Sequence, residues 1–105
     1  MPNVTRVCKG AFQLCRGLRQ LQLSNATHIG AMAFWGCSGL SGELKLPEGL
    51  IKLGMSTFCN CAGLTGEVKL PESLAVIGDR PFSGCTGLYS HDARLPPNEF
   101  VAENV

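Results

Sequence analysis

Residues 34–40 read FWGCSGL, and this stretch decides the fold because it returns along the chain with the same order of residue types. Residues 58–64 read FCNCAGL and residues 82–88 read FSGCTGL, while residues 12–18, FQLCRGL, form a fainter first copy. The phenylalanine, cysteine and leucine positions keep one spacing, of 22 residues and then twice 24. Self-similarity at such a period is typical of repeat proteins whose units stack on their neighbours.

A second repeated segment lies between these copies. Residues 42–48 read GELKLPE and residues 66–72 read GEVKLPE. Apolar and polar residues alternate in residues 44–46, which predicts a half-buried strand, and the proline that follows cannot continue a hydrogen-bond ladder. A further apolar column follows, mostly with a glycine after it: Val7, Ile29, Leu53 and Ile77. We expect this column to bring the chain back along another wall, with a second short strand and a turn that needs glycine.

Units of this size cannot bury an apolar face alone, but they can when they stack on one another. The sequence therefore predicts a solenoid of the α/β class, with about four turns of 22–24 residues over residues 1–97. Each turn is expected to hold short parallel strands and, at the Ala-Phe-x-Gly-Cys segment, a single helical turn. One ladder of stacked rings is expected in the core: Phe12, Phe34, Phe58 and Phe82. Residues 98–105 are expected to form a C-terminal tail or the start of a missing repeat, and a compact globule with residual similarity is the alternative fold.

The run from Ala33 to Leu50 resembles the BspA-like class of leucine-rich repeats, whose pattern is Ile-Gly-x-x-Ala-Phe-x-x-Cys-x-x-Leu. Residues 77–88, IGDRPFSGCTGL, are similar to the same pattern, and the likeness covers about residues 4–96. The resemblance implies a right-handed leucine-rich-repeat solenoid with a parallel sheet along one face. It also implies a binding or adhesion role without chemistry, because members of that class are often surface proteins of microbes and protists. The first copy departs from the pattern by being two residues shorter, and after Leu88 the register slips by one residue.

The composition argues against several classes of partner. Nine Lys and Arg residues against eight Asp and Glu residues give a net charge of +1, so no basic surface for nucleic acid is expected. No apolar run approaches the roughly 20 residues of a membrane span, and Arg6 and Lys9 stand where a signal peptide would need its apolar core. We therefore expect no nucleic-acid partner, no membrane span and no secretory leader. The compartment stays open, since the resemblance suggests secretion or the cell surface whereas unpaired cysteines suggest a reducing compartment.

Four of the six cysteines share one repeat column: Cys15, Cys37, Cys61 and Cys85. Because one column performs one task in every unit, we expect each of these to be a small, buried, free thiol. Cys59 lies outside the column, at a variable position that we expect to be exposed. Cys59 and Cys61 leave open an alternative, a thiol redox or metal protein. A zinc site, however, needs four ligands at suitable spacing, and neither His28 nor His91 falls in a repeat column beside this pair.

No catalytic motif is visible in the chain. It lacks a Gly-x-Ser-x-Gly elbow, a phosphate-binding loop and a His-Glu-x-x-His helix. The glycines are numerous, but they recur with the repeat, so turn geometry explains them. We therefore expect a protein that is not an enzyme, with no catalytic residue, no metal and no cofactor.

Outward-pointing polar residues beside the buried leucines form the most informative surface, which we call the strand face. One of its columns holds Gln20, Glu43, Glu67 and Asp92. The next column, after the one-residue slip, holds Gln22, Lys45, Lys69 and Arg94. Acids stacked on acids repel, while the cations two residues along compensate, so the face carries little net field. We expect it to bind a protein or glycan ligand, and the alternatives are a solubilising surface or a structural spacer with no ligand of its own.

Trp35 is a further candidate for contact with a partner. It fills a column otherwise held by Gln13, Cys59 and Ser83, so we expect its ring to be partly exposed. Tryptophan is enriched among interface hot spots, although a half-buried surface tryptophan is equally ordinary.

The open ends of the solenoid are expected to contact neighbouring repeats or a second copy of the chain.

Overall fold

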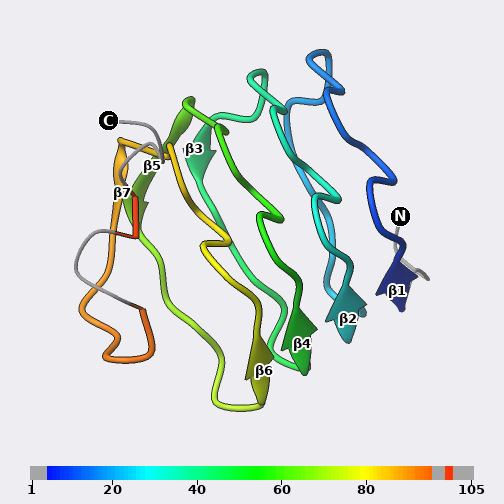
Figure 1. Cartoon of the computed structure of the whole chain (residues 1–105), viewed down its shortest axis with the longest axis vertical. Coiled ribbons are helices and arrows are strands. Elements are labelled where there is room, and N and C mark those ends of the chain that lie inside the picture. The colour runs from blue at the N-terminus through cyan, green and yellow to red at the C-terminus, as the bar shows by residue number, and fades with distance from the viewer. Residues whose placement is uncertain (1–4, 96–98, 101–105) are drawn as a thin grey trace.

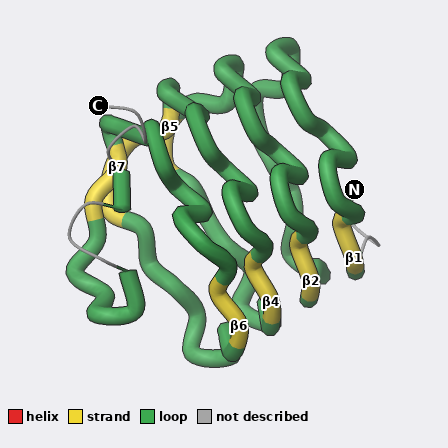
Figure 2. Tube along the Cα trace, viewed as in Figure 1, coloured by secondary structure: helices red, strands yellow, loops and turns green. Residues whose placement is uncertain are grey.

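The computed structural model describes residues 5–95 and 99–100, which form a stack of coils (Figure 1). In every coil, the residue of the Val7 column lies in a two-residue strand. These strands form a parallel sheet of order β1-β2-β4-β6. The strands of this first sheet are β1 (Arg6–Val7), β2 (His28–Ile29), β4 (Lys52–Leu53) and β6 (Val76–Ile77). A second parallel sheet, of order β3-β5-β7, contains β3 (Gly42–Glu43), β5 (Leu64–Glu67) and β7 (Leu88–Tyr89). Loops and turns make up the rest of each coil (Figure 2), so the stacked solenoid with short parallel strands is confirmed.

The second sheet begins earlier along the chain than the alternation of residues 44–46 predicts. β3 ends at Glu43, so Leu44 and Lys45 follow the strand rather than form it. The register pairs Glu43 with Thr65 and Glu67 with Tyr89, two residues away from the repeat phase. A shift of two residues keeps every side chain on its own face of the sheet. The acids of neighbouring coils are therefore displaced along the strands, and the directly stacked acid column expected from the repeat is wrong.

The helical turn expected at the Ala-Phe-x-Gly-Cys segment is replaced by a run of β-turns, and the described residues contain no helix. Met32 and Gly36 have positive φ angles, of 56° and 71°, which a right-handed helix cannot include. Successive N–H groups alternate between two kinds of acceptor. The Cys37 N–H donates to Phe34 within the same coil at 3.2 Å, whereas the Phe34 N–H donates to Thr57 of the next coil at 2.9 Å. We call this segment the turn ladder, because the alternation ties every coil to its neighbour.

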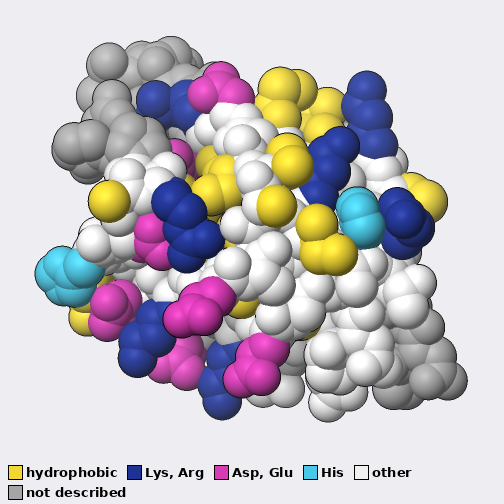
Figure 3. Space-filling view, turned by 90° about the horizontal axis from the view of Figure 1, so that it is seen from below, with side chains coloured by type: hydrophobic (Ala, Val, Ile, Leu, Met, Phe, Trp, Pro, Cys, Tyr) yellow, Lys and Arg dark blue, Asp and Glu magenta, His cyan; other side chains and the backbone are white. Residues whose placement is uncertain are grey.

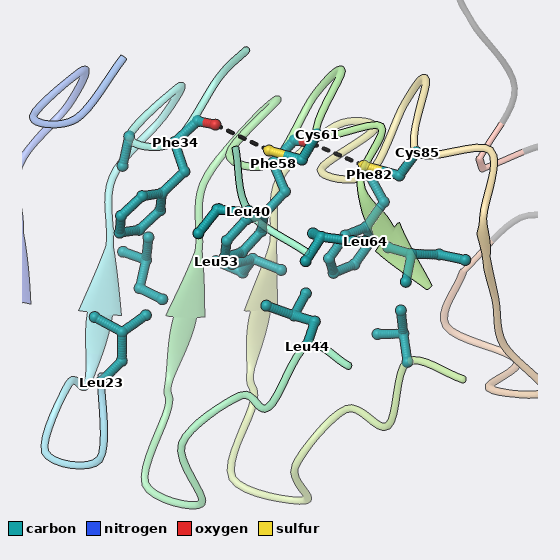
Figure 4. Packing of buried hydrophobic residues seen from close by; sticks show 14 of the residues in the cluster. Leu23, Phe34, Leu40, Leu44, Leu53, Phe58, Cys61, Leu64, Phe82 and Cys85 are labelled. Atoms are coloured by element: carbon teal, nitrogen blue, oxygen red, sulfur yellow. Dashed lines mark hydrogen bonds between the residues drawn. The ribbon is translucent and has the colours of Figure 1, made fainter. Parts of the chain in front are cut away.

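The phenylalanine ladder is confirmed. Phe34 and Phe58 stack with ring centroids 5.3 Å apart and planes within 7°, and Phe12 and Phe82 extend the stack at 5.3 and 5.7 Å. Figure 4 shows the rings of Phe34, Phe58 and Phe82 beside the leucines of the same core. Phe34, Phe58 and Phe82 are fully buried, so each coil completes the apolar core of the next.

Two residues close to the C-terminus lie against the last coil. Glu99 is fully buried, and its Oε2 accepts a hydrogen bond from the Phe82 N–H at 2.8 Å. In earlier coils the corresponding N–H donates to a backbone carbonyl of the next coil. The Phe100 ring packs on Phe82 at 5.9 Å with a tilt of 36°. Burial raises the pKa of the Glu99 carboxyl, although the Phe82 N–H acts in the opposite direction.

Candidate functional site

The strand face forms two neighbouring hollows between coils. The first has a volume of about 360 Å³, and four predicted residues contribute to its lining: Gln20, Gln22, Glu43 and Lys45. The second has a volume of about 530 Å³, and its lining includes Glu43, Lys45, Glu67 and Lys69. Because Glu43 and Lys45 border both hollows, six of the eight predicted strand-face residues lie along one continuous surface.

The charges of this surface are not paired with one another. Lys45 and Lys69 are exposed, as is Glu43, while Glu67 is half-buried. Within residues 5–95, no ion pair joins any of these four side chains to another residue. A ligand therefore does not have to break a salt bridge before it reaches them. Lys45 and Lys69 both lie beyond the ends of their strands. Their ammonium groups are carried by long, flexible side chains, which can adapt to a ligand.

Asp92 and Arg94 lie apart from the two hollows. The Arg94 guanidinium donates to Asp92 through Nη2 at 2.7 Å and through Nε at 3.0 Å. It also donates to three backbone carbonyls of the preceding coil, those of Leu70, Pro71 and Leu74. The hydrogen bond from Arg94 holds the pKa of the Asp92 carboxyl below its usual value. These two residues fasten one coil to the next, and their side chains have partners within the chain.

Tyr89 takes the place beside Glu67 that the repeat assigned to an acid. It lies in β7, is 53% exposed and lines the second hollow. Its ring meets His91 edge-on at 6.0 Å. A sequence signal for Tyr89 exists, since Ser41, Thr65 and Tyr89 each follow the column leucine and so share the outward side of the strand.

Trp35 lies in the turn ladder and is half-buried. It does not line either hollow of the strand face. Its column is buried in the two following coils, where Cys59 is only 7% exposed and Ser83 only 1%, whereas Gln13 in the first coil is exposed. The expectation that Cys59 is exposed is therefore wrong. Its backbone lies inside the turn ladder, where its carbonyl accepts the Gly36 N–H at 2.8 Å and its own N–H donates to Ser56 at 3.2 Å.

The cysteine column adds a second line of contacts between coils. No disulfide joins any of the six cysteines, all of which lie within the described residues. Three of the column are buried and donate through Sγ to the phenylalanine carbonyl of the preceding coil. The pairs are Cys37 to Phe12 at 3.0 Å, Cys61 to Phe34 at 3.1 Å and Cys85 to Phe58 at 2.9 Å. Figure 4 shows the last two of these bonds.

Cys15 is exposed, so the expected burial of the whole column is wrong at this position. It belongs to the first coil of residues 5–95, and within them no earlier coil provides the carbonyl that the other three thiols use.

The environment of the buried thiols opposes thiol chemistry. The pKa of Cys61 is raised most by a hydrogen bond with Cys85 and next by burial. Burial also raises the pKa of Cys37. A nucleophilic or metal-binding cysteine needs the thiolate, which a raised pKa disfavours. Among the described residues, no group of three or more His, Cys, Asp and Glu side chains could hold a metal ion. Cys61 belongs to the packed core, and Cys59 is buried within the turn ladder.

The thiols should differ sharply in their reaction with iodoacetamide. In the native protein at neutral pH, we expect rapid alkylation of Cys8 and Cys15, which are exposed, and protection of the four buried cysteines. The raised pKa of Cys61 and its burial both lower the concentration of accessible thiolate. Peptide mass spectrometry after timed quenching measures each site, and the unfolded protein in urea, where all six should react, is the control. Rapid labelling of Cys59 or Cys61 in the native protein would support the redox alternative instead.

Comparison with known proteins agrees with this architecture. The family model described as BspA type Leucine rich repeat region matches residues 1–98 in six copies, whereas the stacked phenylalanines of residues 12–82 mark four coils. A leucine-rich repeat protein from Bacteroides ovatus ATCC 8483, solved as a crystal structure, is similar with a TM-score of 0.71 and 30% sequence identity. The similarity covers 79% of this chain and 21% of that one, so this chain spans about a fifth of its length. No curated protein matches the sequence.

In the part of the chain that the structure describes, no helix has the length and apolar character needed to cross a membrane. The repeat pattern, the stacked coils and the family match over residues 1–98 lead to one assignment. The chain belongs to the family of BspA-type leucine-rich repeat proteins.

Proposed function

We propose that this chain is a non-catalytic interaction module that binds a protein or a glycan through its strand face. The observation that carries the proposal is the continuity of the two hollows, which share Glu43 and Lys45 and together extend from Gln20 to Tyr89. Binding surfaces of stacked repeats extend over several units because each unit contributes the same positions.

The chemistry of the strand face suits a polar ligand with an apolar or aromatic group. Glu43, Lys45 and Lys69 offer hydrogen bonds and charges of both signs, so the surface discriminates by pattern more than by net charge. Tyr89 adds an exposed ring with a hydroxyl group, a residue type enriched at the centres of interfaces. A surface of this composition matches peptide segments and carbohydrate hydroxyl groups.

A double charge reversal tests the proposal. Purified chain is screened on protein and glycan arrays, and each bound ligand is then titrated against the Lys45→Glu/Lys69→Glu variant. We expect at least about a tenfold loss of affinity, about 1.4 kcal/mol, because two cations that border the hollows become anions. The Arg16→Glu variant is the matched control, since Arg16 is an exposed cation that lines neither hollow.

The two results that would overturn the proposal are distinct. If the arrays retain nothing, the chain acts as a structural spacer. If the strand-face variant binds every ligand as tightly as the original protein, the ligands use another surface.

A further inference from the structure

The first sheet carries a row of basic side chains, with an apolar one at its end, that the proposed function does not use. The parallel register aligns Arg6 with His28, His28 with Lys52, and Lys52 with Val76. These residues alternate with the buried column of Val7 and Leu53, so their side chains lie on the outer side of the sheet. Neighbouring strands are about 4.8 Å apart, so the row extends for about 14 Å from Arg6 to Val76.

A shallow groove of about 550 Å³ runs along this row. Its lining includes Arg6, Lys9, His28 and Lys52, and no Asp or Glu is among the residues that line it. The nearest acid in sequence is Asp79, which follows Gly78 at the β6 end of the groove. Figure 3 shows cationic side chains and a histidine gathered around hydrophobic ones on one part of the surface seen from below, whereas acids and bases mix on another part.

The cations of the groove have no acidic partners among the described residues. Among residues 5–95 and 99–100, no ion pair involves Arg6, Lys9 or Lys52. The His28 ring is held in place, because its Nδ1 lies 2.9 Å from the Thr27 hydroxyl. That hydroxyl donates its single hydrogen to the Thr5 carbonyl at 3.1 Å, so Nδ1 is the donor to Thr27. The imidazole is therefore oriented between two unpaired cations.

The far end of the row is apolar. Val76 is 49% exposed and Met55 is 47% exposed, and both line the groove. Adjacent exposed apolar groups at the end of a charged row favour a ligand that carries negative charge at one end and an apolar group at the other. A nucleic acid or a sulfated glycan would match the cations but would leave Val76 and Met55 without apolar contact.

We propose that this groove binds an extended acidic segment of a partner protein, with two acidic residues at alternate positions and an apolar residue two positions further. An extended chain advances about 3.3 Å per residue, so side chains four residues apart are about 13 Å apart. This matches the length of about 14 Å from Arg6 to Val76. The acids would lie over Arg6, His28 and Lys52, and the apolar side chain would lie over Val76 and Met55.

The test uses a fluorescein-labelled peptide with the core Asp-Ser-Asp-Ser-Leu and the full chain at low ionic strength. Fluorescence anisotropy is expected to show saturable binding that weakens at least about tenfold when the acids are replaced by asparagine. A peptide of the same composition, Asp-Ser-Leu-Ser-Asp, should also bind several-fold more weakly because its apolar residue no longer reaches Val76.

Variants of the protein locate the binding. Arg6→Glu/Lys52→Glu should reduce the affinity at least about tenfold, whereas the strand-face variant Lys45→Glu/Lys69→Glu should bind the peptide unchanged. Circular dichroism verifies that both variants fold, which their exposed positions favour. The proposal is overturned if the two acidic peptides bind equally, if the Arg6/Lys52 variant binds as well as the original, or if only heparin or anionic vesicles bind. These outcomes leave the strand-face proposal untouched, since it depends on other residues.

Discussion

Replacing Phe58 by alanine is expected to lower the free energy of unfolding by about 3–5 kcal/mol, the range typical of a buried phenylalanine that leaves a cavity. The Phe58 ring is fully buried and stacks on two others, Phe34 at 5.3 Å and Phe82 at 5.7 Å. Its loss removes the contact between coils on both sides. Because each coil depends on its neighbours, the remaining ladder cannot compensate by local collapse. Urea unfolding monitored by circular dichroism measures the change.

Phe12→Ala is the matched control for this experiment. Phe12 is half-buried and stacks on Phe34 alone among the ladder rings, so we expect a loss of roughly 2 kcal/mol, in keeping with the partial burial of one aromatic side chain. Equal losses for Phe12→Ala and Phe58→Ala would contradict the view that stacking between coils is the main stabilising contact of the core.

Gly54→Ala is expected to cost at least about 3 kcal/mol, at the upper end of what added core volume typically costs. A Cβ at this position would lie 2.5 Å from the Ala31 nitrogen and 2.7 Å from the Gly30 carbonyl carbon. Both are backbone atoms of the preceding coil, so no side chain can move aside. Adding one methyl group therefore forces β2 and β4 apart. This separation would also lengthen the hydrogen bond that the Gly54 N–H donates to the Ile29 carbonyl at 2.8 Å. The readout is the urea midpoint of the variant together with its far-ultraviolet circular dichroism.

The same substitution at Gly49 provides the control. Nothing lies within 4 Å of a Cβ built there, and the residue is exposed. We expect a change within about 0.5 kcal/mol, with a slight gain possible because alanine restricts the unfolded chain. If Gly54→Ala proved as mild as Gly49→Ala, the close approach of the two coils would not be a constraint on the fold.

The ladder and the spacing of the coils could be predicted from the sequence because they depend on side chains that recur at fixed intervals. Phe34, Phe58 and Phe82 occupy the same position in successive coils, so the period of the repeat alone predicts that their rings stack. The glycine after the apolar column was also visible, but the expected reason, a turn with an unusual backbone angle, is wrong. Gly54 does not adopt a positive φ, and the requirement is the contact of its Cα with another coil. Such a contact depends on how closely two coils approach each other, so it leaves no separate pattern in the sequence of one unit.

Three features of the candidate site do not follow from the repeat pattern alone. The two-residue shift of the second sheet keeps the alternation intact, so the sequence pattern fits both registers equally. That shift places Tyr89 beside Glu67, whereas Asp92 pairs locally with Arg94. Cys59 is buried although Gln13 of the same column is exposed, so the residue types of the column do not predict its burial. The six residues along the hollows were predictable because they alternate with buried leucines.

The turn ladder gives the stack a direction. The N–H groups that leave one coil point to carbonyl oxygens of the following coil, as from Phe34 to Thr57 and from Phe58 to Pro81. At the last coil, the Phe82 N–H instead meets the carboxylate of Glu99. One end of the ladder thus displays donors and the other displays acceptors, so two molecules that met through like ends would oppose groups of the same kind. Association of two molecules through this ladder would therefore join unlike ends, and it would require Glu99 to leave the Phe82 N–H.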